Sequence, residues 1–148
     1  MIDLRPVHIL IAEDTATDAE MTMRAFKKAG LVNNLSWVKD GQEALDYIFC
    51  TGVFAERADG DPTLIVLDLK MPKVNGLDVL KKIKTTEKTR LIPVIMLTSS
   101  AEEPDIVECY EHGVNSYIVK PVESGRFFEE VSKAGFYWAI LNRIPDPR

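Results

Sequence analysis

The chain has 148 residues, of which 46% are apolar and 28% are charged, with 18 basic side chains against 23 acidic ones. This composition is typical of a folded globular protein and excludes disordered and fibrous classes. The formal net charge of −5 and the lack of a basic block argue against nucleic-acid binding. No apolar run is long enough to span a bilayer and residues 1–6 lack a signal-peptide pattern, so we expect a cytoplasmic protein without membrane contact.

The length suits one domain with a single core. We expect residues 1–148 to form it, with the core from about residue 6 to 142 and a short tail over 143–148. Cys50 and Cys109 lie far apart without metal-type spacing, so we interpret them as free thiols. His8 is likewise expected to be isolated and to belong to no set of metal ligands.

Short apolar runs alternate along the chain with segments of helical periodicity. The runs predict five strands, at residues 7–12, 35–38, 64–68, 92–98 and 115–120. Helices are expected between them, with Asp18 as the N-cap of the first and Gly76 opening the third. Right-handed crossovers then give an α/β fold: a doubly wound, five-stranded parallel sheet with helices on both faces, of the flavodoxin-like kind.

Three segments carry more specific expectations. The fourth helix, from about Glu102, is expected to face the core with Ile106, Val107 and Tyr110. The last helix, from about residue 124 to 141, is expected to do so with Phe127, Val131, Ala134, Trp138 and Leu141. Residues 50–63 are rich in turn formers, and we expect an extended surface loop whose role the sequence does not identify.

Asp68 ends a run of four branched apolar residues, and Pro72 prevents that strand from continuing. In open α/β sheets, ligand sites lie at the carboxyl ends of the strands. The residues that follow the other strands are expected at the same edge, namely Glu13, Asp14, Thr98 and Lys120. Hence we predict a site there that combines three carboxylates, a hydroxyl and an ammonium.

Three carboxylates that lie this close repel one another, and keeping them ionised calls for a cation. An oxygen-rich site without cysteine or histidine suits Mg²⁺, bound directly by Asp14 and Asp68, by Glu13 through water, and by a backbone carbonyl near Lys70. With its repulsion lowered, Asp68 can act as an in-line nucleophile toward a phosphoryl group and form an acyl phosphate. The Thr98 hydroxyl and the Lys120 ammonium would then hold phosphoryl oxygens.

These residues resemble the receiver domains of two-component response regulators, and the resemblance covers nearly the whole chain. The matching pieces are Glu13-Asp14, Asp68 followed by Leu-Lys-Met-Pro, Gly76, Thr98-Ser99 and Lys120-Pro121. The resemblance implies that Asp68 accepts phosphate from a histidine kinase, that Glu13 and Asp14 hold Mg²⁺, and that Thr98 and Lys120 bind the phosphoryl group. It also implies a cis peptide at Lys120-Pro121, and a switch in which Thr98 moves and Tyr117 turns inward.

We expect no output domain after the last helix, so the resemblance is to a stand-alone receiver that signals to a downstream protein or a phosphotransfer partner. The 50–63 loop and the aromatic run 136–138 resemble single-domain regulators that partner phytochrome-type histidine kinases. This similarity implies a homodimer through the fourth helix, fifth strand and fifth helix. Lys70 and Ser100, two residues beyond Asp68 and Thr98, stand where they would tune the lifetime of the acyl phosphate, in a direction that stays open.

Two other functions stay open at this point. One is a Mg²⁺-dependent phosphatase or phosphotransferase working through an aspartyl phosphate. The best-known such enzymes carry a second acid two residues after the nucleophile, where this chain has Lys70. The other is a partner-binding module that acts without phosphate, although no site residue is missing. We therefore expect no enzyme in the usual sense, but a phosphoacceptor that catalyses only its own phosphorylation and dephosphorylation.

Overall fold

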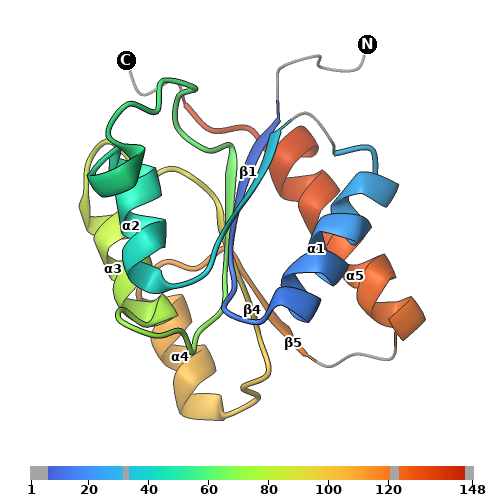
Figure 1. The fold of residues 1–148 in the computed structure, drawn as a ribbon. Helices are drawn as coiled ribbons and strands as arrows, with labels where there is room; N and C mark the ends of the chain where they lie inside the picture. The colour runs from blue at the N-terminus through green and yellow to red at the C-terminus, as the bar shows by residue number, and fades with distance from the viewer. Residues whose placement is uncertain (1–6, 32–33, 121–123, 146–148) are drawn as a thin grey trace.

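The computed structural model describes residues 7–31, 34–120 and 124–145 (Figure 1). Five strands lie within these ranges: β1 (His8–Ala12), β2 (Asn34–Val38), β3 (Leu64–Leu67), β4 (Val94–Thr98) and β5 (Ser116–Val119). Five α-helices alternate with them: α1 (Ala16–Lys28), α2 (Gly41–Phe49), α3 (Gly76–Thr85), α4 (Glu103–Glu111) and α5 (Ser124–Phe136). A 3₁₀ turn, η1 (Gly52–Phe54), follows α2, and a π-helical turn, η2 (Tyr137–Leu141), continues α5.

The strands form one parallel sheet in the order β2-β1-β3-β4-β5. This arrangement confirms the doubly wound fold expected from the sequence. The strand order reverses between β1 and β3, where Ala12 pairs with Leu67. The next residue of each strand is an acid, Glu13 and Asp68, so the topology alone places two carboxyl groups side by side at the switch point.

Helices α1 and α5 cover one face of the sheet, while α2, α3 and α4 cover the other (Figure 1). The central strands supply both layers of the core in alternation, as a pleated strand must. In β3, Ile65 and Leu67 pack under α2 and α3, whereas Leu64 and Val66 pack under α1 and α5. Burial on both faces explains why this strand reads as an uninterrupted apolar run.

The first helix begins earlier than the sequence suggested. Its N-cap is Thr15 and not Asp18, and Thr15 makes no side-chain capping bond. The Thr15 carbonyl accepts the first helical bond from the Ala19 amide, at 3.0 Å. Asp18 therefore lies inside the first helical turn, where an acidic side chain suits the helix dipole.

Two predicted apolar stripes were wrong in part. In α4, Cys109 is fully buried, while Val107 and Tyr110 are 46% and 51% exposed. Only the side of α4 that carries Cys109 therefore faces the sheet. At the other end of the chain, Leu141 is 57% exposed because η2 is a π-helical turn, whose wider spacing rotates Leu141 off the stripe that Val131 and Ala134 follow.

The segment 50–63 is largely exposed, as expected for a surface loop, but it contains the 3₁₀ turn η1. Val53 in that turn is 89% exposed. Both cysteines are free thiols, as predicted, with Cys109 buried and Cys50 half-buried. Across the described ranges, none of the helices combines the length and apolarity needed to cross a membrane.

Candidate functional site

The carboxyl edge of the sheet is the edge at which the strands end, and helix α3 starts directly against it. A Cβ atom on Gly76 would lie 2.1 Å from the backbone oxygen of Asp68. Only glycine permits an approach this close, so Gly76 lets the start of α3 pack against the Asp68 backbone. The Gly76 amide also donates to the Leu69 carbonyl, at 2.7 Å, which fixes the turn after β3.

The three predicted metal ligands come together at this edge. Ligand oxygens of Glu13, Asp14 and Asp68 all lie within 4.8 Å of one another. Glu13 and Asp68 are 3% and 8% exposed, whereas Asp14 is open to solvent. A set of carboxylate oxygens with one open side is the ligand set that a hard divalent cation prefers. Residues present in this chain therefore fit such an ion.

The ammonium of Lys120 lies beside the acids but contacts the expected acceptor only loosely. Its Nζ atom is 2.7 Å from Glu13 Oε1 and 2.9 Å from Asp18 Oδ2, and 3.7 Å from Asp68 Oδ2. Burial disfavours the charged form of Lys120, but the hydrogen bonds to Glu13 and Asp18 and the nearby negative charges outweigh it and raise its pKa. Lys120 therefore stays a cation in this site.

Glu13 is the most deeply buried acid of the three. Burial raises the pKa of its carboxyl to about 7, and the charge of Asp68 adds to this rise against the lowering effect of Lys120. The backbone of Glu13 is held firmly, because its carbonyl accepts from Trp37 Nε1 at 2.7 Å and its amide donates to the Val38 carbonyl at 3.0 Å. A fixed carboxyl with an elevated pKa gains its charge more readily once a cation lies beside it.

Thr98 and Tyr117 come from the adjacent strands β4 and β5. Thr98 is fully buried at the end of β4, and its Oγ1 atom accepts weakly from the Ser100 amide at 3.3 Å. The Tyr117 hydroxyl donates to the Ser100 carbonyl at 2.9 Å, and the ring is half-buried against the core. The Ser100 hydroxyl in turn donates to Asp105 Oδ2 at 2.6 Å, so this loop ties β4, α4 and β5 together.

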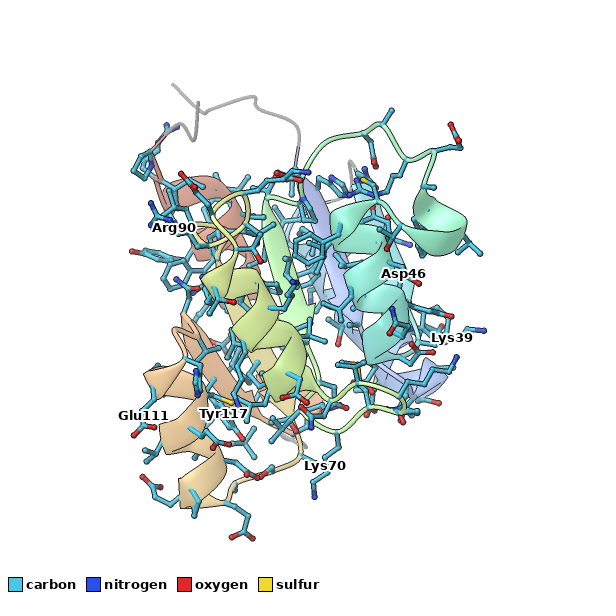
Figure 2. All side chains as sticks on the ribbon, turned by 90° about the vertical axis from the view of Figure 1, so that its left-hand side faces the viewer. Lys39, Asp46, Lys70, Arg90, Glu111 and Tyr117 are labelled. Carbon is cyan, nitrogen blue, oxygen red and sulfur yellow. The ribbon has the colours of Figure 1, made fainter. Side chains whose placement is uncertain are left out.

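Two further predictions concern the Lys70 carbonyl and the peptide bond between Lys120 and Pro121. The Lys70 side chain extends outward at the carboxyl edge (Figure 2), and the Lys70 amide points back to Asp68 Oδ1 at 3.4 Å. Whether the Lys70 carbonyl binds a metal stays a prediction. The cis peptide expected between Lys120 and Pro121 falls on Pro121, which lies outside the described residues.

The sequence did not reveal Asp18 as part of the site. It reads as a helix cap from its position before an apolar repeat, yet its carboxylate pairs with Lys120 from 102 residues away. No local signal pointed to this contact, because Asp14 precedes α1 and its four-residue spacing from Asp18 is therefore not a helical one. Three carboxylates thus lie within 3.7 Å of one ammonium, and Asp14 lies beside two of them.

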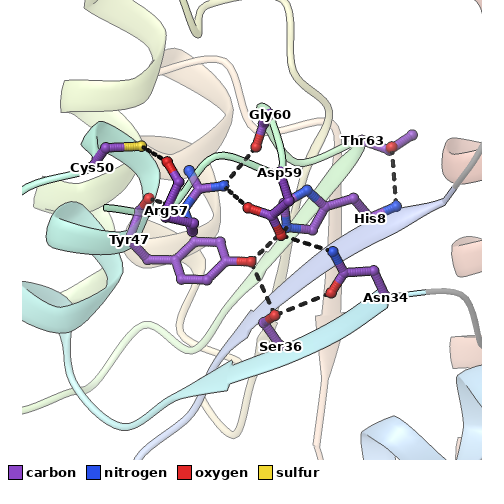
Figure 3. Close-up of polar contacts among 9 residues, drawn as sticks. All are labelled: His8, Asn34, Ser36, Tyr47, Cys50, Arg57, Asp59, Gly60 and Thr63. Carbon is purple, nitrogen blue, oxygen red and sulfur yellow. Dashed lines mark hydrogen bonds and ion pairs between the residues drawn. The ribbon is translucent and has the colours of Figure 1, made fainter. Parts of the chain in front are cut away.

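A second buried polar cluster lies at the opposite end of β1 (Figure 3), where the sequence suggested an isolated histidine. His8 Nε2 lies 2.5 Å from the Tyr47 hydroxyl and 3.6 Å from Asp59 Oδ2. Arg57 stacks on the Tyr47 ring, 4.2 Å from its centre, and its Nη1 donates to Asp59 Oδ1 at 2.6 Å. The expectation of an isolated His8 was therefore wrong, because the 50–63 loop folds back over it.

Comparison of this sequence with known proteins finds matches along most of the chain. The model of the response regulator receiver domain matches residues 9–132. The chain is 37% identical to the probable methanogenesis regulatory protein FilR2 of Methanothrix harundinacea, over 96% of this chain and 90% of that protein. It is 32% identical to the response regulator Rcp1 of Synechocystis sp., over 95% of this chain and 94% of Rcp1.

Solved structures agree with these matches. The phosphorylated cyanobacterial phytochrome response regulator RcpA superposes with a TM-score of 0.86 at 31% identity, covering 95% of this chain and 99% of RcpA. The Mn²⁺-bound form of Rcp1 gives the same TM-score at 30% identity, over 95% and 100% of the two chains. The bacteriophytochrome response regulator AtBRR is 48% identical with a TM-score of 0.74, over 93% and 98%. Similarity in sequence and in fold therefore extends over nearly the whole chain.

Proposed function

This chain belongs to the response regulator receiver domain family, and on that premise we propose that it is a phosphorylation-controlled switch with Asp68 as its phosphoacceptor. One observation carries the proposal. Asp68 is a nearly buried carboxylate at the switch point of the sheet, with two further carboxyl groups within 4.8 Å and an ammonium at 3.7 Å. Such a site can accept an anionic group on Asp68 and balance its charge.

The proposed reaction is transfer from a phosphohistidine of a histidine kinase. A carboxylate oxygen of Asp68 attacks phosphorus in line with the phosphorus–nitrogen bond. The new oxygen–phosphorus bond forms as the old bond breaks, and the imidazole nitrogen keeps the electron pair and takes a proton from solvent. Lys120 and the Thr98 hydroxyl are the donors on this chain that we assign to the phosphoryl oxygens.

The metal that we propose is Mg²⁺, held by Asp14 and Asp68, by Glu13 through water, and by the Lys70 carbonyl. The close set of three carboxyl groups supports a divalent cation, and Rcp1 has been crystallised in a Mn²⁺-bound form. When bound, such an ion supplies positive charge that lowers the repulsion between Asp68 and an incoming phosphoryl group. The role of this chain is to keep Glu13 and Asp14 fixed beside the nucleophile.

Thr98 and Tyr117 are the residues that we assign to the conformational response. Phosphate on Asp68 would draw the Thr98 hydroxyl toward it, and the β4–α4 loop would follow. Tyr117 is already hydrogen-bonded to that loop through the Ser100 carbonyl, so loop and ring would move together. The switch would then alter the surface formed by α4, β5 and α5.

As partner we propose a phytochrome-type histidine kinase. Rcp1 is a response regulator, and RcpA is described as a cyanobacterial phytochrome response regulator. AtBRR is a bacteriophytochrome response regulator. FilR2 is described as a regulator of methanogenesis, so the proposal depends on the structural relatives rather than on every relative. Phosphotransfer from a light-regulated kinase, compared with a kinase of another class, would test this assignment.

We further propose that the α4-β5-α5 surface binds a second copy of the chain. Large apolar side chains on this side of the molecule are unusually exposed, namely Val107, Tyr110, Phe136, Tyr137 and Leu141. A hollow of about 480 Å³ is lined by two of them, Tyr110 and Tyr137, together with Tyr117 and Trp138. Sedimentation should give a dimer that Tyr137→Ser weakens, whereas Val53→Ser, on the 50–63 loop, should leave it intact. A monomer at all concentrations would contradict this assembly.

The test of the central proposal is the intact-protein mass after incubation with acetyl phosphate and Mg²⁺. We expect one phosphoryl adduct, dependent on Mg²⁺ and labile to base, in the native chain. Asp68→Asn should fold normally and carry no adduct. An undiminished adduct in this variant would move the acceptor to another residue, and a native chain that never forms an adduct would favour a module acting without phosphate.

A phosphate-release assay separates the enzyme alternative, which would also pass through a single adduct on Asp68. A phosphatase would release phosphate from a simple phosphate ester over many turnovers. The position where such enzymes carry a second acid holds Lys70, whose side chain points to solvent, so no general acid stands there. We expect at most one phosphoryl group per chain.

A further inference from the structure

Lys120 is held by two carboxylates, and neither is the proposed acceptor. Its Nζ atom contacts Glu13 at 2.7 Å and Asp18 at 2.9 Å, and stays 3.7 Å from Asp68. An ammonium has three donor protons, and two of them are used by these contacts. The third proton remains for Asp68, but a phosphoryl oxygen there shares a cation whose charge Glu13 and Asp18 already partly neutralise, and both carboxylates oppose a shift of Nζ toward it.

The two partners of Lys120 differ in how easily they release it. The Glu13 side chain is 5% exposed and that of Lys120 8%, so parting these two would leave buried charge unpaired. The Asp18 side chain is 37% exposed, and water can replace Lys120 as its partner. Asp18 is therefore the contact that costs least to break.

The place of Asp18 in the first turn of α1 suits the helix dipole but does not require its contact with Lys120. It does not cap α1, because the N-cap is Thr15. The helix holds its backbone, since the Asp18 carbonyl accepts from the Thr22 hydroxyl at 3.0 Å. Its carboxylate is thus presented to Lys120 from α1, an element separate from the strand ends that carry the proposed acceptor and metal ligands.

We infer that Asp18 is a positioning residue that restrains Lys120 in the resting protein and competes with the phosphoryl group for its ammonium. This inference rests on the proposed function of Asp68. In the phosphorylated protein Lys120 exchanges Asp18 for a phosphoryl oxygen and keeps Glu13. The strength of the Asp18 contact sets how readily the acyl phosphate forms and how long it persists.

The decisive variant is Asp18→Asn, compared with Glu20→Gln as a matched loss of one negative charge on α1. Glu20 is exposed and, among the residues that the structure describes, pairs with Arg24, so Glu20→Gln removes the same charge without touching the Lys120 contacts. At saturating Mg²⁺ we expect Asp18→Asn to bind beryllofluoride, a phosphoryl mimic, about three- to tenfold more tightly than the native chain. The acyl phosphate should persist longer by a similar factor.

The signal of Trp37 can be used to follow beryllofluoride binding, because its indole donates to the Glu13 carbonyl inside the site. Glu20→Gln should match the native chain in both readouts, and Asp18→Glu should restore most of the native behaviour. A merely structural ion pair would change the unfolding midpoint of Asp18→Asn but not its beryllofluoride affinity. Asp18→Ser gives a second variant with the charge removed, should the amide form contacts of its own.

The outcomes separate the two proposals. A native chain that neither binds beryllofluoride nor forms an adduct overturns the function of Asp68. A native chain that does both, with Asp18→Asn and Asp18→Ser equal to Glu20→Gln, overturns the role of Asp18 alone. Weaker binding in the Asp18 variants would also overturn it, because Asp18 would then orient Lys120 toward the phosphoryl group.

Discussion

Strand β1 begins in one buried polar cluster and ends in another, and the two differ in their charge balance. At its start, His8 packs with Tyr47, Arg57 and Asp59 beneath the 50–63 loop (Figure 3). At its end, Glu13 lies with the other carboxylates around Lys120. Both clusters bury ionisable groups, so burial alone does not separate a structural cluster from a functional one.

The cluster at the start of β1 is closed. Arg57 uses its donors on Asp59, on the Gly60 carbonyl at 2.6 Å and on the Tyr47 carbonyl at 2.9 Å. Burial lowers the pKa of His8 and so favours its neutral ring, and the Arg57 guanidinium pairs with the Asp59 carboxylate. The buried polar atom without a partner among the described residues is His8 Nδ1.

The cluster at the end of β1 is unbalanced, because the negative charges of several acids face a single ammonium. Its acids are held by backbone contacts that prevent them from moving apart, as the fixed position of Glu13 illustrates. The excess of negative charge is stored repulsion that a cation can relieve. Charge imbalance on a rigid frame, and not burial, is what marks this end of β1 as the site.

The largest effect is expected from Arg57→Ala. This change removes the Arg57 hydrogen bonds to the Tyr47 and Gly60 carbonyls and to the Asp59 carboxylate, together with the stacking on Tyr47, and should lower the free energy of unfolding by about 2–4 kcal/mol in urea titrations. Phosphorylation of Asp68 should be unchanged at temperatures where the variant is folded. Arg24→Ala, which breaks an exposed pair with Glu20, should cost no more than about 0.5 kcal/mol.

Equal losses in the two arginine variants would mean that the loop cluster contributes no more than a surface ion pair. A folded Arg57→Ala chain with an altered phosphoryl adduct would mean that the two ends of β1 are coupled. Either result would break the distinction between a closed structural cluster and an open functional one.

A second prediction concerns the dependence of stability on pH. As pH rises, the contributions of Glu13, at the end of β1, and of His8, at its start, should change in opposite directions. The pKa of Glu13 rises from 4.5 to about 7 on folding, so the native state holds that proton more tightly than the unfolded chain. This contribution to stability is present below about pH 4.5 and is lost as pH rises through about 7. This contribution is on the order of 3 kcal/mol.

His8 acts in the other direction. Its pKa is lowered by burial from 6.5, so the unfolded chain binds that proton more readily and stability falls as pH drops below about 6.5. We expect urea unfolding in EDTA between pH 5 and 8 to separate the two residues. The free energy of unfolding of Glu13→Gln should not decline toward neutral pH, and that of His8→Gln should not decline toward acid pH. A Glu13→Gln profile parallel to that of the native chain would show that Glu13 titrates normally.

The fold and the acidic part of the site followed from the sequence for a physical reason. Central parallel strands are buried on both faces, so they appear as continuous apolar runs whose ends are visible. Parallel topology then sends every strand end to one edge, which is why Glu13, Asp14 and Asp68 could be placed together without coordinates. These predictions needed only local patterns and one topological rule.

Contacts between distant side chains could not be predicted in this way. The pairing of Asp18 with Lys120 depends on the exact start of α1, and local pattern suits Thr15 and Asp18 equally as caps. Lys84 stands among the charged residues of α3, where the local pattern does not show burial, yet its Nζ donates to the Ile92 carbonyl at 2.8 Å, and burial lowers its pKa to about 8. Leu141 left the predicted stripe because periodicity assumes α-helical spacing where the chain forms a π-helical turn.

The smallest expected effect is that of replacing an aspartate by asparagine, which should change stability in opposite directions at the two ends of β1. Asp14 is exposed and lies beside two other carboxyl groups, so Asp14→Asn should relieve repulsion and raise stability in EDTA by about 1 kcal/mol. Asp59→Asn should instead lower stability, because hydrogen bonds from Arg57 and Asn34 hold the pKa of Asp59 below its usual range. Urea titrations at pH 7.5 compare these two aspartate-to-asparagine changes directly.

Adding Mg²⁺ should separate these two variants further, because an ion that binds only the native state stabilises that state. The native chain and Asp59→Asn should both gain stability with Mg²⁺, while Asp14→Asn should gain little. If Asp14→Asn destabilised the metal-free protein, the acids would already be balanced by contacts within the chain. Repulsion would then no longer distinguish the end of β1 from its start, and the proposed metal site would lose its main physical support.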